Sequence, residues 1–307
     1  MPALGFAPRV RIGLGVLACL IAASASAQTN TNPHQAVLRA QLASRLTQLA
    51  DKVDGVMGYA VVDLTTGDRF GLRENEVYPT ASTIKLSILY ELFKQADAGT
   101  IKLDEPMPIP PASRVGGSGL LFELTSPRLS LRDYATLMIL ISDNTATNVI
   151  IDTLGLAKIQ ARLDGLGFTK TKLRRRMMDT DAARRGNENV SSPAEVARLL
   201  ELFHKGEGLT AESKKAALDI LTKPKTTAFT RTLPSGVRVA SKPGGLDAVV
   251  VDAGLVLLDT RPYIAAFMCT YLLDEAVGNR AVGEASRAVF DYFERLGAEG
   301  SYGRRIR

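Results

Sequence analysis

The chain has 307 residues, of which 46% are hydrophobic and 23% are charged, and its formal net charge is +6. This composition is ordinary for a globular protein, and the length suffices for one large domain or two closely joined ones. The only histidines are His34 and His204, which argues against a zinc hydrolase and against a serine–histidine–aspartate triad. We expect no cofactor and no metal. We also expect no nucleic-acid partner, because no basic stripe interleaved with aromatic residues is present.

Residues 1–27 have the pattern of a secretory signal peptide. Two arginines precede an apolar run at residues 12–23, and Ala25-Ser26-Ala27 offers small residues for cleavage. The run is shorter than the roughly 20 apolar residues that span a bilayer. We therefore expect export to the periplasm, cleavage near Ala27 and no stable membrane insertion afterwards. Lipid attachment at Cys19 is the alternative, although the sequence after it stays apolar.

The elements that follow alternate between helical and β-rich patterns. Leucines at helical spacing predict a helix at 37–49, and a β-rich run at 56–62 with a turn at 65–68 predicts a hairpin. A long helical block comes next, with its clearest helices at 82–96, 131–141, 145–154 and 193–203. Ser192, Pro193 and Glu195 have the pattern of a capping box at the start of the last of these. Strands return at 237–241, 249–258 and 263–271, and a final helix stops at Gly297.

These elements predict an α+β fold. Strands in direct succession favour an antiparallel sheet, which the opening hairpin would join. We expect about five strands, flanked by the N- and C-terminal helices, in a sheet domain made of residues 28–75 and 222–307. Residues 76–221 would form an all-helical insertion. Cys269 should pack in the core of the sheet domain, and we expect a monomer.

Ser82-Thr83-Ile84-Lys85 stands at the start of a predicted apolar helix. Residues three apart share a helix face, so we expect the Lys85 amine to lie against the Ser82 hydroxyl and act as its base. A helix N-terminus also directs free backbone N–H groups at an oxyanion on a substrate bound to Ser82. Alone, a serine and a lysine at this spacing are a weak signal, because chance produces such pairs.

A second motif, Ser142-Asp143-Asn144, lies between two predicted helices. The Ser142 hydroxyl could pass a proton between Lys85 and a leaving group, and the Asn144 amide could hold a substrate carbonyl. The alternative interpretation is a polar N-cap for the helix that follows.

A third motif, Ser241-Lys242-Pro243-Gly244-Gly245, ends a predicted strand. Lys242 would anchor a substrate carboxylate and lower the pKa of Lys85. The glycines would let a strand edge approach the substrate, with Gly245 giving a second oxyanion N–H. The alternative interpretation is a simple turn.

Ser142 follows Ser82 by 60 residues, and Lys242 follows Ser142 by 100. In this order and at these separations, the three motifs resemble the signature of class A β-lactamases and their close penicillin-binding relatives. The resemblance covers nearly the whole mature chain, including the run from Ser142 to Asn148 and Arg231 ahead of the third motif. It implies the following roles: Ser82 as nucleophile, Lys85 as general base, Ser142 as proton shuttle, Lys242 as carboxylate anchor, Asn144, Gly244, Gly245 and Arg231 as substrate-binding residues, and Asn148 as the residue that holds the Ω-loop.

Two departures from the family pattern stand out. Pro243 replaces a threonine or serine, so carboxylate recognition must depend on Lys242 with Arg231, Ser241 or Thr232. A methionine also occupies the place of the Ω-loop glutamate that activates the deacylating water in class A enzymes, within the segment Leu173 to Asp181. Three acids could replace that glutamate: Asp179 first, then Asp181 and Glu188. Asp179 could instead be structural, paired with one of the neighbouring arginines.

Three functions compete on this evidence. The first is a β-lactamase that opens small-molecule β-lactams through an acyl-enzyme on Ser82. The second is a D,D-peptidase that acts on peptidoglycan stem peptides and is only acylated by penicillins. The third is a slowly deacylating β-lactam-binding protein. The compact chain and the run Ser142–Asn148 favour the first, by analogy with the family.

Overall fold

The computed structural model describes the whole chain except residues 4, 6–32, 299, 301 and 306–307. The expected signal peptide, with Cys19, thus falls almost entirely outside the described residues. From Asn32 to Arg307 the chain forms one compact unit. In the part of the chain that the structure describes, no helix has the length and apolarity needed to cross a membrane.

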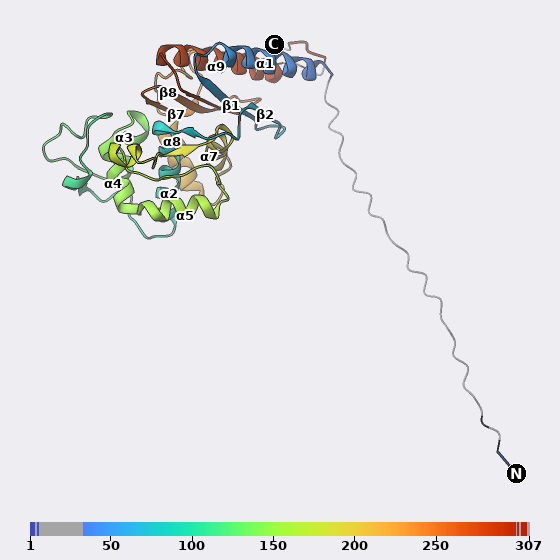
Figure 1. The fold of residues 1–307 in the computed structure, drawn as a ribbon, viewed down its shortest axis with the longest axis horizontal. Helices are drawn as coiled ribbons and strands as arrows, with labels where there is room; N and C mark the ends of the chain where they lie inside the picture. Colours follow the sequence, from blue (N-terminus) through green and yellow to red (C-terminus); the bar gives the residue numbers. More distant parts are fainter. Residues whose placement is uncertain (4, 6–32, 299, 301, 306–307) are drawn as a thin grey trace. The chain divides into compact units, whose positions relative to one another are not determined.

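A five-stranded antiparallel sheet lies at the centre of this unit (Figure 1). Its strands are β1 (Val56–Asp63), β2 (Arg69–Leu72), β7 (Val239–Leu246), β8 (Val249–Val256) and β9 (Tyr263–Thr270), in the order β2-β1-β9-β8-β7. The expected antiparallel sheet of about five strands is confirmed. The hairpin joins the late strands because β1 pairs with β9 along its full length, from Val56 opposite Thr270 to Asp63 opposite Tyr263.

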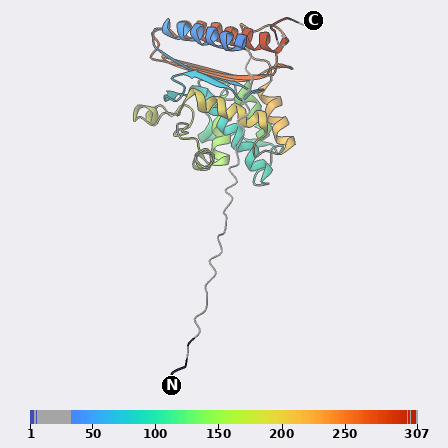
Figure 2. The same cartoon turned by 90° about the vertical axis from the view of Figure 1, so that its right-hand side faces the viewer.

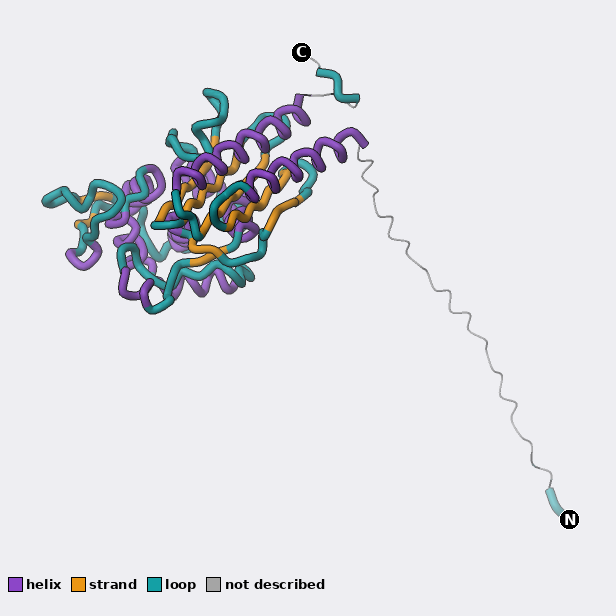
Figure 3. Tube along the Cα trace, turned by 45° about the horizontal axis from the view of Figure 1, so that its top comes forward, coloured by secondary structure: helices purple, strands orange, loops and turns teal. Residues whose placement is uncertain are grey.

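The two terminal helices cover one face of the sheet. Helices α1 (Pro33–Asp51) and α9 (Glu275–Ala298) run side by side across it (Figures 2 and 3). Their apolar faces pack against the side chains on this face of the sheet, in a core that includes Leu46, Phe267, Val289 and Phe293. Cys269 is buried there, as expected.

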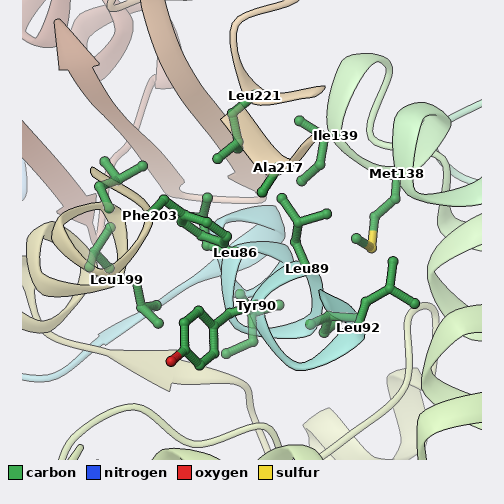
Figure 4. Close-up of a cluster of buried hydrophobic side chains, with 14 of the residues drawn as sticks. Leu86, Leu89, Tyr90, Leu92, Met138, Ile139, Leu199, Phe203, Ala217 and Leu221 are labelled. Atoms are coloured by element: carbon green, nitrogen blue, oxygen red, sulfur yellow. The ribbon is translucent and has the colours of Figure 1, made fainter. Parts of the chain in front are cut away.

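Helices cover the other face of the sheet. They are α2 (Lys85–Asp97), α3 (Leu131–Leu140), α4 (Asn144–Leu154), α5 (Leu156–Gly165), α6 (Thr180–Arg184), α7 (Pro193–Lys205) and α8 (Ala211–Leu221), with the 3₁₀ helices η1 (Ala81–Ile84) and η2 (Pro111–Ser113). Helix α2 lies in their middle, where Leu86, Leu89 and Leu92 are completely buried (Figure 4). A helix that is apolar on nearly every side must be enclosed, and this one is packed by α4, α5, α7 and α8.

Two details of this layer differ from the sequence-based expectation. The layer is not all helical: β3 (Tyr78–Pro79) pairs with β6 (Val190–Ser191), and β4 (Met107–Pro108) pairs with β5 (Arg128–Leu129). The sequence did not predict these two-residue strands because β3 and β4 each contain a proline, which usually argues against a strand.

Of the two hydrogen bonds that a capping box at α7 predicts, one is present. The Ser192 side chain accepts from the Glu195 backbone N–H at 3.3 Å. The Glu195 carboxylate does not return the bond but accepts from the backbone N–H groups of Thr169, Lys170 and Thr171. It therefore fastens α7 to the segment that opens the Ω-loop.

Candidate active site

Ser82 lies at a sharp turn directly before the buried helix α2. It belongs to η1, and α2 begins three residues later. Ala81, the residue before it, has a φ of +45°, a left-handed conformation that is costly for an L-residue with a side chain. Such strain persists only where the surroundings over-determine it, and it is common at active sites. The Ser82 side chain is half-buried at this turn.

Lys85 is completely buried and makes three hydrogen bonds. Its Nζ lies 2.7 Å from the Ser142 carbonyl oxygen, 3.0 Å from Ser142 Oγ and 3.0 Å from Asn144 Oδ1. An ammonium donates all three bonds, whereas a neutral amine donates two and accepts the third from the Ser142 hydroxyl. The expected direct bond to Ser82 is not among the interactions of the described residues, because the amine is turned towards the second motif.

The surroundings of Lys85 favour its neutral form. Burial, and after it the charge of Lys242, hold the pKa of Lys85 well below its ordinary value, and the Asp143 carboxylate opposes them. A lowered pKa increases the fraction of the amine that is neutral, and the neutral amine can accept a proton from a hydroxyl.

The second motif divides between structure and chemistry. Asp143 is the N-cap of α4, and its Oδ1 accepts from the Ala146 N–H at 2.8 Å, so the N-cap interpretation is right for this residue. The residues on either side of it, Ser142 and Asn144, both contact Lys85. Ser142 has a φ of +58°, a second strained position in the site.

A glycine-rich segment that the sequence analysis missed completes this side of the site. The Asn144 side-chain amide donates to the Gly116 carbonyl at 3.1 Å, and its backbone N–H donates to the Ser118 carbonyl at 3.0 Å. Ser118 thereby lines the groove beside Ser82 and Ser142. The signal was the run Gly116-Gly117-Ser118-Gly119, in which Gly117 and Gly119 have φ values of +88° and +101°.

The third motif lies on β7, the edge strand of the sheet next to η1. Lys242 is completely buried, and its Nζ donates to Ser142 Oγ at 3.2 Å and to the Pro243 carbonyl at 2.7 Å. Ser142 Oγ thus has a lysine amine on each side. A Cβ at Gly244 would lie 2.7 Å from the Ser82 backbone nitrogen, so only glycine lets this strand approach the serine so closely.

A groove of about 920 Å³ runs along β7. Ser82, Ser118 and Ser142 line one part of it, and Arg231 and Asn279 line another. Arg231 is exposed and donates to the Asn279 carbonyl at 2.8 Å. A groove of this size is within the usual range for small-molecule sites.

The two other candidates for carboxylate recognition are placed differently. The Thr232 hydroxyl donates to the Gly283 carbonyl at 2.9 Å. Ser241 is 1% exposed and alternates with Lys242 along the strand, so its side chain lies on the sheet face that α9 covers, as that of Val239 does.

The Ω-loop is closed and fixed at several points. Lys172 and Val190 exchange backbone hydrogen bonds at its neck. The Asn148 side chain accepts from the Met177 N–H at 2.9 Å and donates to the Met177 carbonyl at 3.2 Å. Asn148 follows Asn144 by one turn of α4. Met177, which is bound to Asn148, is therefore held about one helical turn from Asn144, the residue that contacts Lys85.

None of the three proposed loop acids forms a hydrogen bond or an ion pair with Lys85, Ser142 or Asn144 in the described structure. Asp179 is exposed and caps α6, where its Oδ1 accepts from the Ala182 N–H at 2.9 Å. Asp181 pairs with Arg184 in solvent. Glu188 forms a two-pronged ion pair with Arg175, with N–O distances of 2.9 and 3.0 Å. Asp179 thus has a structural role as a helix cap, and it is not the partner of an arginine among the ion pairs of the described residues: Arg175 pairs with Glu188 and Arg176 with Asp152.

Ser82 and Ser142 thus flank a buried lysine whose pKa is lowered, beside the edge strand of an antiparallel sheet. This arrangement is that of a serine hydrolase of the class A β-lactamase type. Comparison with known proteins agrees. The family model described as the beta-lactamase enzyme family matches residues 41–293. The chain belongs to this family, and the expected recognition, fold and enzyme class are confirmed.

The relatives include both β-lactamases and a penicillin-binding type. An imipenem-hydrolyzing beta-lactamase of Enterobacter cloacae is 26% identical over 294 residues, which cover 92% of this chain and 96% of that protein. The solved structure of PBP-A is 31% identical, with a TM-score of 0.76 over 83% of this chain and 97% of that one. A mutant of PBP-A, solved as an acyl-enzyme complex with penicillin G, is 30% identical, with a TM-score of 0.77 over 84% of this chain and 97% of that one.

Proposed function

We propose that the protein opens β-lactams by forming an acyl-enzyme on Ser82. The observation that carries this proposal is the position of Ser142 Oγ, 3.0 Å from Lys85 Nζ and 3.2 Å from Lys242 Nζ. Two buried amines on one hydroxyl support a path along which a proton received by Lys85 can reach a leaving group. The histidine of a conventional triad is replaced by Lys85.

In the acylation step, Ser82 Oγ attacks the lactam carbonyl carbon as neutral Lys85 receives the hydroxyl proton. The C–N bond of the ring then breaks, and Ser142 passes a proton from Lys85 to the departing nitrogen. The developing oxyanion would be held by the backbone N–H groups of Ser82 and Gly245. On an edge strand the nitrogen of Pro243 faces outward, and the alternation of a strand gives the Gly245 N–H the same direction.

The remaining side chains would orient the substrate. Asn144 has one amide hydrogen on the Gly116 carbonyl and a second for a substrate carbonyl. Lys242 and Arg231 would bind the substrate carboxylate. Their two charges would take the place of the hydroxyl donor that is missing at Pro243. Asn148 would hold the Ω-loop through Met177.

Breakdown of the acyl-enzyme is expected to be slow. Asp179, Asp181 and Glu188 are each engaged in a cap or an ion pair, so no loop carboxylate is free to activate water beside Lys85 in the described structure. This favours a second candidate function, a D,D-peptidase of peptidoglycan stem peptides that penicillins acylate, and the likeness to PBP-A supports it.

One experiment separates the candidates. Purified mature protein is mixed with a chromogenic cephalosporin, and product and intact protein mass are followed together. Many turnovers per molecule support a β-lactamase, whereas one equivalent of product with a lasting adduct supports the slow or D,D-peptidase alternative. The Ser82→Ala variant should show no adduct, and an adduct that survives this change would overturn the assignment of Ser82.

The cellular setting is part of the proposal. The signal-like pattern of residues 1–27 supports export to the periplasm, where β-lactams and stem peptides both occur, and a protein that turns over β-lactams there would contribute to antibiotic resistance. Edman sequencing of the exported protein, expected to begin near Gln28, tests the cleavage, and a diacylglycerol mass on Cys19 would contradict it.

A further inference from the structure

Met178 and Phe122 are two apolar side chains that stay exposed beside the glycine-rich segment. Each is 47% exposed. A Cβ at Gly117 would lie 2.8 Å from the Met178 sulfur and 2.8 Å from Asn144 Nδ2, so the thioether and the amide border the same small space. The Phe122 ring lies beside Gly116, where a Cβ would be 3.9 Å from two of its carbon atoms. Both side chains therefore lie next to the residues that surround the Asn144 amide.

The position of Met178 is fixed by its backbone. Its φ is +63°, a left-handed conformation that is costly for a residue with a side chain. Asn148 binds both the N–H and the carbonyl of the preceding Met177, and the Thr180 N–H donates to the Met178 carbonyl at 2.9 Å. Strain of this kind is common at ligand-binding sites, and burial of the side chain does not offset it here.

The loop that carries Phe122 is fixed as well. Arg114 Nη1 donates to the carbonyl oxygens of Phe122 at 3.0 Å and Leu124 at 2.5 Å. Asp143 Oδ2 accepts from the Leu121 N–H at 2.9 Å. These bonds hold the backbone and leave the phenyl ring exposed, so the ring is available to a ligand without a rearrangement of the loop.

A bound penicillin would bring its side chain to these two residues. The second amide hydrogen of Asn144 is the proposed donor to a substrate carbonyl, and outside the lactam ring that carbonyl belongs to the acylamino side chain. The group attached to this carbonyl would then lie beside Met178. A thioether and an aromatic ring favour an apolar or aromatic group, and methionine adapts to groups of different shape.

An ammonium group in the same place would lose water without gaining an equivalent partner, which costs free energy. Of the carboxylates next to these segments, Asp143 accepts from three backbone N–H groups and Asp179 caps α6. Glu123, in the loop itself, is exposed and is the one acid that could attract the ammonium from solvent. The wall formed by Met178 and Phe122 is apolar.

We propose that Met178 and Phe122 are specificity-determining residues, which select β-lactams with an apolar acyl side chain over those that carry an ammonium group there. The inference rests on the proposed acylation of Ser82. Both residues contact the substrate side chain, and neither takes part in the bond changes at the lactam ring.

Two penicillins that differ by one group test the preference. Penicillin G has a phenylacetyl side chain, and ampicillin has the same side chain with an α-amino group. The second-order rate of acylation of the mature protein is measured for each by intact mass, at a pH at which the amine is protonated. Penicillin G should react about tenfold faster, the effect of one partly buried apolar group. Equal rates, or a faster reaction of ampicillin because Glu123 binds its ammonium, overturn the proposal.

Variants assign the preference to the two residues. Met178→Glu should reverse it, because a carboxylate in this place attracts the ammonium. Met178→Gln is the matched control, with the same length and no charge, and it should weaken the preference without reversing it. Phe122→Ala should slow penicillin G more than ampicillin. A reversal by glutamine, or an equal slowing of both penicillins as a general loss of site structure would cause, overturns the proposal.

Both side chains are exposed, so their replacement should leave folding intact, which circular dichroism checks. If Met178→Glu does not fold, Phe122→Ala decides alone, and an unchanged ratio of the two rates there overturns the proposal. Failure of the proposed function is distinguishable, since the unaltered protein would then form no adduct on Ser82 with either penicillin.

Discussion

At Ser142 the backbone is held in a left-handed conformation that few serines adopt, and the same is true of Ala81 beside the nucleophile. Each such residue costs on the order of 1–3 kcal/mol. At Ser142, Lys85 contacts both the backbone carbonyl oxygen and the side-chain hydroxyl. The contacts of this buried lysine therefore offset the strain at Ser142, and they fix the Ser142 hydroxyl beside the amine.

At the residue scale, Met177 offers a direct test of why deacylation should be slow. Its backbone is clamped by Asn148, and its side chain is buried. Met177→Glu would introduce a carboxylate one helical turn from the contact between Asn144 and Lys85, and it should speed loss of the adduct by about 10²- to 10⁴-fold, the usual value of a general base. Deacylation is measured by intact mass after removal of free drug.

The matched control for this change is Met177→Gln, which has the same length and no basic carboxylate. It should leave deacylation as slow as in the unaltered protein. If the glutamine variant accelerates equally, the effect comes from a loosened loop and the missing glutamate is not the cause.

At the element scale, the α3–α4 junction and the glycine-rich segment 116–119 act as one unit. Asp143 caps α4 with one oxygen and accepts with the other from the backbone N–H groups of Leu120 and Leu121, at 2.7 and 2.9 Å. This single carboxylate sets the position of Ser142 and Asn144, and it also holds the residues that follow Ser118 on the same part of the groove.

Gly119→Ala tests this unit. Gly119 has a φ of +101°, and a Cβ there would overlap the Asp143 carboxylate. The variant should lose about 2–3 kcal/mol of unfolding free energy and acylate more slowly, because the caps of both segments are displaced.

Gly67→Ala isolates the cost of conformation from that of contact. Gly67 has a φ of +80° and open space around its missing side chain. The Gly67→Ala variant should lose about 1 kcal/mol of unfolding free energy, measured with denaturant, and acylate at the normal rate. An equal loss in both variants would show that the contact with Asp143 is unimportant.

Sequence reasoning succeeded where the signal was local or periodic. The strands, the helix of Leu86 and Leu89, and the turn position of Ser142 follow from alternation, helical spacing and flanking elements. Contacts between distant segments were not visible in this way. The bond from Asn144 to Gly116 spans 28 residues, and the caps that occupy Asp179 and Glu195 depend on which backbone N–H groups the fold leaves free.

At the scale of the whole molecule, the sheet unites the two ends of the chain. Asp63 at the end of β1 accepts from Arg261, in the turn before β9, with distances of 3.0 and 2.7 Å to its Nε and Nη2 atoms. The two side chains are only 5% and 15% exposed. Asp63 also accepts from the Thr65 N–H in its own turn, so one carboxylate closes two turns at the same edge.

Arg261→Met should therefore destabilise the protein strongly, by about 3 kcal/mol, because the buried Asp63 carboxylate loses its partner. Lys215→Met removes an exposed partner of Asp219 and should cost less than about 1 kcal/mol. Chemical denaturation at pH 7 measures both. Equal effects would mean that Asp63 is satisfied by its turn alone.

Cys269 lies on β9, the strand that pairs with both β1 and β8, and it is completely buried. Burial raises the pKa of its thiol to about 12, so almost none of it is thiolate in the folded state. A thiol reagent can modify it only when the central strand opens. The rate at which a thiol reagent modifies Cys269 therefore measures how often the central strand opens, and with it the sheet that supports the site.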